Sequence, residues 1–419
     1  MLSNTSDKLI SNTQGNSPMQ DRRSFLLATG AVVAGSCATS FAANETLQVG
    51  LIGTGGRCRA LTRSLLTIPN VKVTAISDVR DDALAETKKM VGDKVAVSKH
   101  FPELLQRKDV DAVLIASPDH WHVPMTVAAC ETKKDVYVEK PLTHDLSEGK
   151  AVIDAQNKHA RIVQVGTQQR SMPHIMKARQ IIQSGGIGKV VKVHMTCNRN
   201  SDRLRRAKDS LDPKSVDWKA FLGNAREQKF DEYRMRNWRW FWDFGGGIFT
   251  DLMVHWIDVA HWVLNVDHPE KAVSLGQHTV SEGVWETPDT VQTILSYKGG
   301  IQMHFEGTFA NAREGAHIVF MGEKANMYVD RGAYILTPEL RHTKTVNADE
   351  LVLSTNPKHR GADFYDKPDG ELVHLTNWIE SIKSRKAPSA PAEGGVGSAS
   401  AAHLANMALR NGGTAVWKE

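Results

Sequence analysis

The sequence predicts an α/β protein, with a doubly wound parallel sheet in its first part and half-buried antiparallel strands in its second part. Two observations support this fold class. Between residues 47 and 139, short apolar strands alternate with helical stretches over short connections, which is typical of a parallel sheet. After residue 189, apolar and polar residues alternate with the period of two that strands with one buried face show.

The first part is expected to supply the ligand site. Its elements alternate in chain order: strand 47–52, helix near 61–68, strand 71–78, helix 81–91, strand 111–116, helix near 124–132 and strand 135–139. Ligands of doubly wound sheets bind beyond the carboxyl ends of the strands. Residues that directly follow these strands are therefore the first candidates for a functional site.

The second part is expected to contain strands followed by helices. Alternating patterns predict strands at 189–196, 291–297 and 301–309. Helical patterns cover residues 372–382 and 399–408, and the segment 387–397 between them is rich in Pro, Gly and Ser. We expect that segment to be a loop.

Composition excludes several classes of protein. The 419 residues are 24% charged and 41% hydrophobic, as in ordinary folded proteins, and the length suits two or three domains. A net charge of +5 is too small to indicate nucleic acid or an anionic membrane as a partner. The 4 cysteines lack metal-type spacing and are too few for a disulfide scaffold, so we expect free, mostly buried thiols.

Residues 1–43 have the pattern of a twin-arginine export signal. The pair Arg22-Arg23 precedes a weakly hydrophobic stretch, 25–43, that ends in small residues. A membrane-spanning helix is the first alternative, but the stretch is short for a span and rich in small polar residues. A lipid anchor at Cys37 is the second. We expect a periplasmic or otherwise exported protein without a stable membrane anchor.

A glycine-rich turn follows the first strand. It contains, in order, Gly53, Thr54, Gly55, Gly56, Arg57 and Cys58. Strand, glycine turn and helix form the context in which a backbone approaches a pyrophosphate and a helix N-terminus binds it. Such a turn in an unrelated α/β fold is the alternative interpretation.

An acidic residue ends the next strand. Asp78 lies 25 residues after Gly53, somewhat beyond the usual spacing of about 20 for the acid that binds a ribose 2′-hydroxyl. A carboxylate there would repel a 2′-phosphate, so NAD is favoured over NADP as the cofactor. Arg80 nearby leaves NADP open as the less favoured choice.

Five ordered motifs resemble the glucose-fructose oxidoreductase, inositol dehydrogenase and rhizopine-catabolism (Gfo/Idh/MocA) family. They are Gly-Thr-Gly-Gly-Arg at 53–57, Ser-Pro-Asp-His-Trp-His at 117–122, Glu-Lys-Pro at 139–141, Gly-Thr-Gln-Gln-Arg at 166–170, and the segment 245–258 that begins Gly-Gly-Gly-Ile-Phe-Thr-Asp. The resemblance runs from about residue 46 to the C-terminus. Cys58 and Val254 depart from the family pattern, since they occupy positions where the family carries, or often carries, glycine.

The resemblance implies an architecture. A Rossmann-type NAD(P)-binding domain would cover residues 44–167, and an α+β domain for substrate and oligomerisation would cover 168–419. The second domain would have a large open, mainly antiparallel sheet, with one face over the nicotinamide and the other often a subunit interface. We therefore expect a homo-oligomer, a dimer or tetramer, whose C-terminal helices could pack back on the first domain.

Lys140 is the candidate general acid/base. Removing a hydride from a secondary alcohol leaves a hydroxyl proton, and a lysine whose pKa is lowered by partial burial beside a cationic nicotinamide can accept it. The resemblance implies this role for Lys140, with Glu139 positioning it. An exposed lysine at the start of a turn is the alternative. The residues expected to contact the cofactor are Gly53, Thr54, Gly55, Gly56, Arg57, Asp78, Ser117, Pro118, His120, His122, Glu139, Lys140 and Gln168.

Asp251 and His255 lie four residues apart on a predicted helix, so they share one face, which Asp258 continues. The resemblance places such a pair in the substrate site, and we expect both residues to act in catalysis and substrate binding. One alternative is a metal site that also includes Asp258 and His261. Another is a capping aspartate with a hydrogen-bonded core histidine. We expect no metal.

The segment 233–242 is dense in aromatic and cationic residues. Aromatic rings stack on the apolar faces of sugars and guanidinium groups bind hydroxyls, so Arg236 and Trp238, together with Arg170, are candidate substrate-binding residues. Packing against the neighbouring domain and binding of single-stranded nucleic acid are alternatives. We expect no nucleic-acid partner because the net charge is low.

We expect an exported enzyme that uses tightly bound NAD to oxidise a secondary alcohol of a sugar or polyol. A second hypothesis is a glycoside hydrolase or lyase that uses NAD in a redox-neutral cycle of oxidation, elimination, hydration and reduction, as related NAD-dependent glycosidases do. A third is a catalytically silent binding protein, which the presence of Lys140, Asp251 and His255 disfavours.

Overall fold

The computed structural model describes residues 45–200, 211–353 and 370–418, all within one compact unit. The predicted export segment, 1–43, lies outside the described residues. Among the residues described, no helix combines the length and the apolar character that a membrane span requires. Three of the cysteines predicted to be free thiols, Cys58, Cys130 and Cys197, are buried, and none of the three forms a disulfide.

The first sheet has six parallel strands in the order β3-β2-β1-β4-β5-β6. The strands are β1 (Leu47–Ile52), β2 (Val71–Ser77), β3 (Ala96–Ser98), β4 (Ala112–Ile115), β5 (Asp135–Val138) and β6 (Val163–Val165). The strand order reverses between β1 and β4, which creates the crevice where doubly wound folds bind their ligands. The predicted doubly wound parallel sheet is confirmed.

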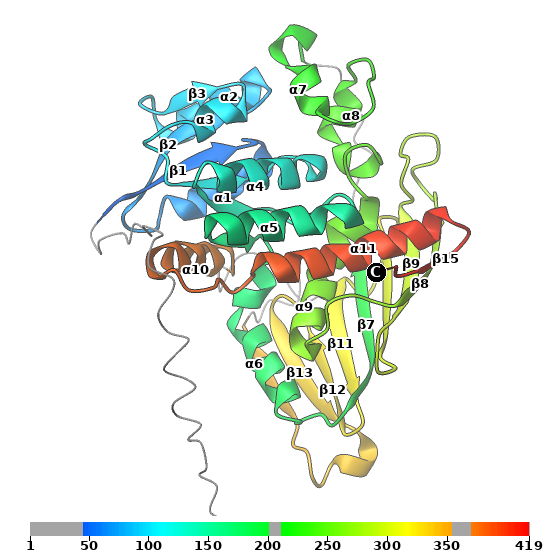
Figure 1. The fold of residues 1–419 in the computed structure, drawn as a ribbon. Coiled ribbons are helices and arrows are strands. Elements are labelled where there is room, and N and C mark those ends of the chain that lie inside the picture. The colour runs from blue at the N-terminus through cyan, green and yellow to red at the C-terminus, as the bar shows by residue number, and fades with distance from the viewer. Residues whose placement is uncertain (1–44, 201–210, 354–369, 419) are drawn as a thin grey trace, which may run out of the picture. The chain divides into compact units, whose positions relative to one another are not determined.

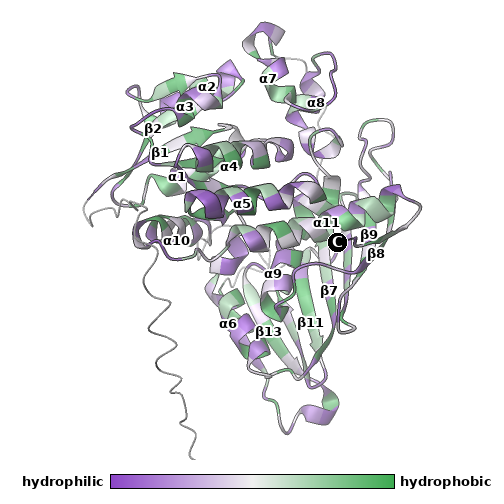
Figure 2. Cartoon of the chain, viewed as in Figure 1, coloured by the Kyte–Doolittle hydropathy of each residue, from purple (hydrophilic) through white to green (hydrophobic). Residues whose placement is uncertain are grey.

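Helices surround the strands of this sheet (Figure 1). They are α1 (Gly56–Leu65), α2 (Asp81–Val91), α3 (Phe101–Leu105), α4 (His122–Glu131), α5 (Gly149–His159), α10 (Gly370–Ser384) and α11 (Ala392–Arg410). The C-terminal helix α10 contacts α1, whereas α4 contacts α5 and α5 contacts α11. Polar and apolar residues mix on these helices, as expected for elements with one buried face (Figure 2).

The second sheet has nine strands in the order β14-β13-β12-β11-β7-β10-β9-β8-β15. The strands are β7 (Val190–Asn198), β8 (Lys271–Gln277), β9 (Thr290–Ser296), β10 (Gln302–Thr308), β11 (Ala316–Gly322), β12 (Ala325–Val329), β13 (Ala333–Pro338), β14 (Asp349–Val352) and β15 (Thr414–Val416). Neighbouring strands are antiparallel except β7 and β10, which are parallel. The expected large, mainly antiparallel sheet is confirmed.

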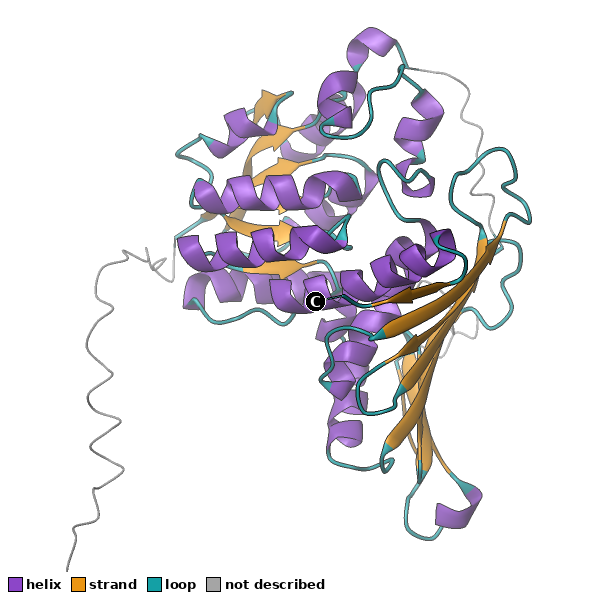
Figure 3. Ribbon diagram, turned by 45° about the vertical axis from the view of Figure 1, so that its right-hand side comes forward, coloured by secondary structure: helices purple, strands orange, loops and turns teal. Residues whose placement is uncertain are grey.

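Helices cover one face of the second sheet, and Figure 3 shows them gathered on a single side of the strands. These are α6 (Pro173–Gln183), α9 (Val254–Leu264) and α11. The strands contribute residues such as Val193 and Phe305 to this core, and α9 contributes Trp256, all of them buried. Because side chains alternate across a strand, the neighbours of these core residues lie on the opposite face of the sheet.

The prediction of a loop over 387–397 is wrong from residue 392 onward, where α11 begins. A Cβ on Gly394 would lie 2.5 Å from the Arg170 guanidinium, and a Cβ on Gly395 would lie 2.6 Å from the Val165 side chain. A Cβ on Gly397 would lie 2.6 Å from the Asp267 carbonyl oxygen. These glycines therefore let a helix pack closely on its neighbours rather than mark a loop.

Candidate functional site

The glycine turn between β1 and α1 has the backbone geometry that its sequence predicts. Gly53 has a φ of +77°, and a Cβ there would lie 2.6 Å from the Ser117 amide nitrogen, so only glycine fits. Gly55 precedes α1, and no atom lies within 4 Å of the position of its missing Cβ. The turn is therefore close to β4 on one side and open on the other.

A cavity of about 400 Å³ opens beside this turn, and we call it the glycine-turn cavity. Its walls come from the ends of β1, β2 and β4 and from α3, α7 (Trp218–Leu222) and α8 (Glu232–Arg236). The predicted cofactor residues in its walls are Gly53, Gly55, Asp78, Ser117 and Pro118. The cavity thus lies at the crevice of the doubly wound sheet, where a dinucleotide is expected.

Asp78 is the acid in this cavity. Its carboxylate accepts hydrogen bonds from the Thr54 hydroxyl at 3.3 Å and from the Arg80 amide at 2.9 Å. Burial raises the pKa of Asp78 above its ordinary value, although these hydrogen bonds oppose the shift. The Arg80 side chain is held by Asp82, with 3.0 Å between Nε and Oδ1. The acid therefore faces the cavity while the nearby guanidinium is already paired.

A second cavity, of about 370 Å³, adjoins the first, and we call it the lysine cavity. The two share Ala116, Ser117 and Trp238 in their walls. The predicted site residues in the walls of the lysine cavity are Arg57, Ser117, His122, Glu139, Lys140, Gln168, Trp238, Asp251 and His255. The structure thus brings together residues that lie more than 100 positions apart in the chain.

Lys140 lies at the end of β5 with 10% of its side chain exposed. Its Nζ donates to the Asp251 carbonyl oxygen at 2.8 Å and to Asp251 Oδ1 at 3.1 Å. Arg239 Nε donates to the same Oδ1 at 3.0 Å. One carboxylate therefore holds two cationic side chains and fixes the direction of the Lys140 ammonium.

Asp251 and His255 lie on a helix whose first turn differs from the predicted α-helix. Residues Phe249–Met253 form a π-helical turn that runs into α9. The preceding Gly247 has a φ of +67°, and a Cβ there would lie 2.7 Å from Thr287. A π-helical turn inside a helix is frequent at functional sites because it changes the direction of the side chains it carries.

The His255 ring is neutral and is free to form a hydrogen bond with a substrate hydroxyl. Burial and the charge of Lys140 lower the pKa of His255 well below its ordinary value. Its Nδ1 is buried and makes no hydrogen bond to any described residue. A neutral imidazole in the wall of a polar cavity can donate to or accept from a substrate hydroxyl.

Arg57, in the wall of the lysine cavity, connects three parts of the fold. Its guanidinium donates to Glu139 Oε1 at 2.8 Å, to Gln168 Oε1 at 2.9 Å and to Glu371 Oε2 at 2.5 Å. Burial alone would raise the pKa of Glu139, but the charges of Arg57 and Lys140 hold it below its ordinary value. The side chain next to Lys140 is therefore an ionised carboxylate.

Replacing Glu371 with glutamine is expected to lower the free energy of unfolding by about 2 kcal/mol, the typical contribution of hydrogen bonds to a charged group. The carboxylate accepts from Arg57 and from the Ser64 hydroxyl at 2.9 Å, and it is largely buried. Urea denaturation measures the change. Glu380→Gln, at an exposed position of the same helix, is the control and should change little. Equal stability of both variants would contradict the role given to Glu371.

Five predicted site residues lie outside the walls of both cavities: Thr54, Gly56, His120, Arg170 and Arg236. His120 Nε2 lies 2.9 Å from the Phe221 carbonyl oxygen. Arg236 pairs with Glu232 one helical turn earlier, with 2.6 Å between Nε and Oε1. The ring nitrogens of His122, which is in the cavity wall, lie 2.6 Å from the Pro141 carbonyl oxygen and 2.9 Å from that of Ser117.

The alternative metal site on the predicted helix does not form. Asp258 makes two hydrogen bonds of 2.8 Å with the Arg170 guanidinium. His261 Nε2 lies 2.7 Å from the Tyr297 hydroxyl oxygen. Among the described residues, the group of metal-type ligands includes none of the helix residues Asp251, His255, Asp258 and His261.

Two arginines in the walls of the lysine cavity, Arg239 and Arg199, are not among the predicted site residues. Arg239 lies in the aromatic and cationic segment, but the position that faces the cavity depends on the turn Trp238–Trp240. Its guanidinium stacks on the Trp238 ring at 4.2 Å. Arg199 follows β7, and no local pattern distinguishes it from other arginines.

Comparisons with known proteins agree with this geometry. Residues 47–167 match the family model described as an oxidoreductase family with an NAD-binding Rossmann fold, Gfo/Idh/MocA. Residues 175–328 match the model of the Gfo/Idh/MocA C-terminal domain. The two matches cover most of both sheets and the segments that carry Lys140, Asp251 and His255.

Relatives of known name include the myo-inositol 2-dehydrogenase of Thermotoga maritima, 26% identical over 351 residues, or 82% of this chain and 90% of that protein. A glycosyl hydrolase family 109 protein of Saccharopolyspora erythraea is 35% identical over 130 residues, 29% of this chain and 28% of that protein. A levoglucosan dehydrogenase solved with NADH and levoglucosan has the same fold, with a TM-score of 0.69, 18% identity, and coverage of 90% of this chain and 100% of that one.

Proposed function

Because the chain belongs to the Gfo/Idh/MocA family of NAD-binding oxidoreductases, we propose that it oxidises a secondary alcohol of a sugar or polyol, with Lys140 as general acid/base. The observation that carries this proposal is the placement of Lys140. Its ammonium lies in a polar cavity that adjoins the glycine-turn cavity, and Asp251 and His255 line the same polar cavity.

The residues present fit NAD. Gly53 permits the close approach of the turn to β4, and the missing Cβ of Gly55 leaves open space where a pyrophosphate would come near the α1 N-terminus. Asp78 offers a carboxylate to a ribose hydroxyl. When bound, NAD supplies a nicotinamide ring that accepts a hydride.

The residues of the lysine cavity supply the proton chemistry. Lys140 in its neutral form accepts the proton of the substrate hydroxyl at Nζ, and Asp251 stabilises the ammonium that results. Arg239 shares the Asp251 carboxylate, so the negative charge near Lys140 is partly balanced. The neutral ring of His255 is available to orient a neighbouring substrate hydroxyl.

Replacing Asp78 with asparagine is expected to reduce the preference for NAD⁺ over NADP⁺ by about 10- to 100-fold, because a hydrogen bond to a charged group contributes about 1.5–3 kcal/mol. The ratio of kcat/KM for the two cofactors measures the change. Asp93→Asn, at a fully exposed position after α2, is the matched control and should leave the ratio unchanged. An unchanged ratio in Asp78→Asn would remove Asp78 from cofactor recognition.

A second candidate function is redox-neutral cleavage of a glycoside by an enzyme that retains its NAD. It is favoured by the 35% identity over 130 residues with the glycosyl hydrolase family 109 protein. Export by a twin-arginine signal, which we also propose, would favour the same function, because a protein exported with its cofactor has to regenerate that cofactor in place. Tight retention of NAD and assembly into a homo-oligomer remain part of the proposal.

The two candidates are distinguished by one assay. The purified chain is incubated with NAD⁺ and either free sugars and polyols or aryl glycosides, while absorbance at 340 nm and released aglycone are followed. Net NADH formation with a free sugar or polyol supports the oxidoreductase. Aglycone release without net NADH supports the glycosidase, and failure to bind any dinucleotide would remove both.

A further inference from the structure

The open face of the second sheet carries a cluster of metal-ligand side chains, His194, His304 and Glu306. Residues between and beside them on the strands, Val193 and Phe305, are buried in the core beneath the helices. The cluster therefore lies on the opposite face, away from α6, α9 and α11. None of its three residues lines either cavity of the candidate active site.

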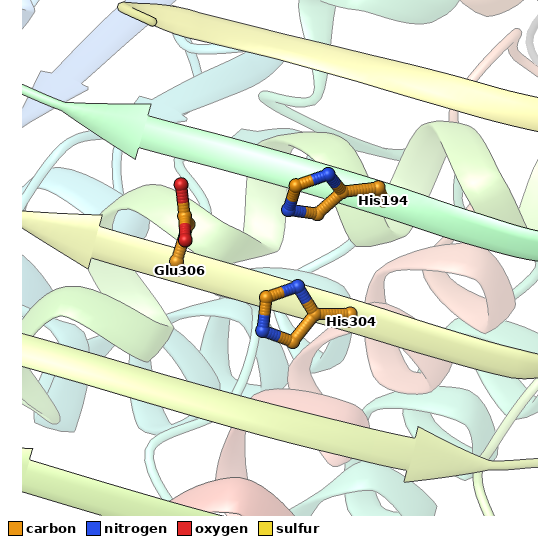
Figure 4. A group of neighbouring side chains, drawn as sticks. All are labelled: His194, His304 and Glu306. Carbon is orange, nitrogen blue, oxygen red and sulfur yellow. The ribbon is translucent and has the colours of Figure 1, made fainter. Parts of the chain in front are cut away.

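Strand register brings the cluster together. His194 on β7 lies directly opposite His304 on β10, in a parallel pair. Glu306 lies two residues after His304, so it shares the same face of β10. Figure 4 shows the two imidazole rings side by side on adjacent strands, with the Glu306 carboxylate beside them. The ring centroids are 4.8 Å apart.

The donor atoms are close to the spacing of a metal site. One ligand atom from each residue can be chosen so that all three lie within 4.8 Å of one another. Tetrahedral bonds of about 2.1 Å to a zinc ion place two ligand atoms about 3.4 Å apart, so rotations of the three side chains that bring their ligand atoms closer by up to about 1.4 Å would close the site. His194 Nε2 is buried and makes no hydrogen bond to any described residue.

The protonation states suit metal binding. Burial lowers the pKa of both His194 and His304, and the proximity of the two rings lowers that of His304 further. Both imidazoles are therefore neutral at pH 7, with a lone pair for a metal, whereas Glu306 offers a negative oxygen. The charges of Glu306 and Glu314 oppose this lowering of the His194 pKa, whereas His317 and Lys192 add to it, and the net direction is downward.

We propose that His194, His304 and Glu306 bind one divalent transition-metal ion of the zinc class, with the remaining coordination position open to water. Two imidazole nitrogens and one carboxylate oxygen are a common donor set for Zn²⁺, whereas Mg²⁺ and Ca²⁺ prefer oxygen ligands alone. The site joins β7 to β10, the one parallel pair among the described strands of this sheet. Bound metal would cross-link these strands and stabilise the sheet.

The test uses the full chain without a polyhistidine tag, stripped of metal by a chelator that is then removed. Co²⁺ is titrated as a spectroscopic probe, and Zn²⁺ is added in competition. We expect one Co²⁺ per chain, with visible absorption bands that Zn²⁺ displaces, and a higher Tm with Zn²⁺. His304→Gln should weaken Zn²⁺ binding at least about 100-fold, because even second-shell changes cost 10–100-fold.

His159→Gln, on α5, is the matched control and should bind like the unaltered chain. If His304→Gln fails to fold, as judged by circular dichroism and thermal melting, Glu306→Gln replaces it and should also weaken binding. No stoichiometric Co²⁺ binding would overturn the proposal. Binding that His304→Gln and Glu306→Gln leave unchanged would overturn it as well.

Discussion

Replacing Lys140 with methionine should lower kcat by roughly 10²–10⁴, the usual contribution of a positioned general acid/base. Methionine keeps the length and apolar stem of the side chain but removes the group that accepts the substrate proton. Lys140 Nζ donates hydrogen bonds to Asp251 and to none of the described residues that line the glycine-turn cavity. The affinity for NAD⁺ should therefore change little. Steady-state kinetics with titration of NAD⁺ measure both quantities.

Lys150→Met is the control for this variant. Lys150 lies on α5, is largely exposed and pairs with Asp154 on the surface, so its replacement should leave kcat unchanged. A Lys140→Met enzyme with undiminished kcat would rule out the acid/base role. A loss of NAD⁺ binding equal to the loss of kcat would instead assign Lys140 to cofactor binding.

Replacing Asp258 with alanine should lower the free energy of unfolding by about 3–5 kcal/mol, because it leaves a buried guanidinium without its carboxylate. Asp258 on α9 and Arg170, just before α6, make two hydrogen bonds of 2.8 Å. The side chain of Asp258 is 0% exposed and that of Arg170 is 7% exposed. Water cannot replace the lost partner, so the penalty is not screened.

Urea denaturation tests this expectation, with Asp267→Ala at an exposed position after α9 as the control. The double variant Arg170→Met with Asp258→Leu should recover part of the stability, since an apolar pair of similar volume replaces the ion pair. A loss below about 1 kcal/mol in Asp258→Ala, the size typical of a surface pair, would contradict the burial argument.

Much of the fold follows from local patterns in the sequence. Apolar runs and helical periodicity predict β1, β2, β4 and β5 and the helices α1, α2 and α4, and burial along their whole length makes β4 and β5 short, mostly apolar segments. The short elements β3, α3 and β6, of three to five residues, are not predicted. The order of strands in the second sheet did not follow. The parallel pair β7 and β10 is separated by more than 100 residues, and no local pattern records which distant strand becomes a neighbour.

Glycine shows why local rules fail at particular positions. Gly53 and Gly55 were correctly interpreted as a turn, since a positive φ and an open approach are needed there. Gly394, Gly395 and Gly397 gave the same local signal but lie in α11, where their lack of a side chain permits close packing. Only the tertiary neighbours distinguish the two uses.

The candidate site was only partly predictable for the same reason. Motif residues such as Lys140, Asp251 and His255 share one cavity, as the ordered motifs suggest. Arg170 and Arg236 instead form ion pairs with Asp258 and Glu232, which depend on helix packing that the sequence does not reveal. Arg239 occupies the cavity in their place.

The most direct test of the account follows a deuterium atom from substrate to cofactor. The chain is incubated with NAD⁺ and a panel of sugars and polyols that carry deuterium on the carbons that bear the hydroxyl groups. The recovered cofactor is then analysed by mass spectrometry. The account predicts NADH that carries a single deuterium with the unaltered chain, and the same labelled NADH formed roughly 10²–10⁴ times more slowly with Lys140→Met. Oxidised product that forms without deuterium reaching the nicotinamide would contradict hydride transfer at this site.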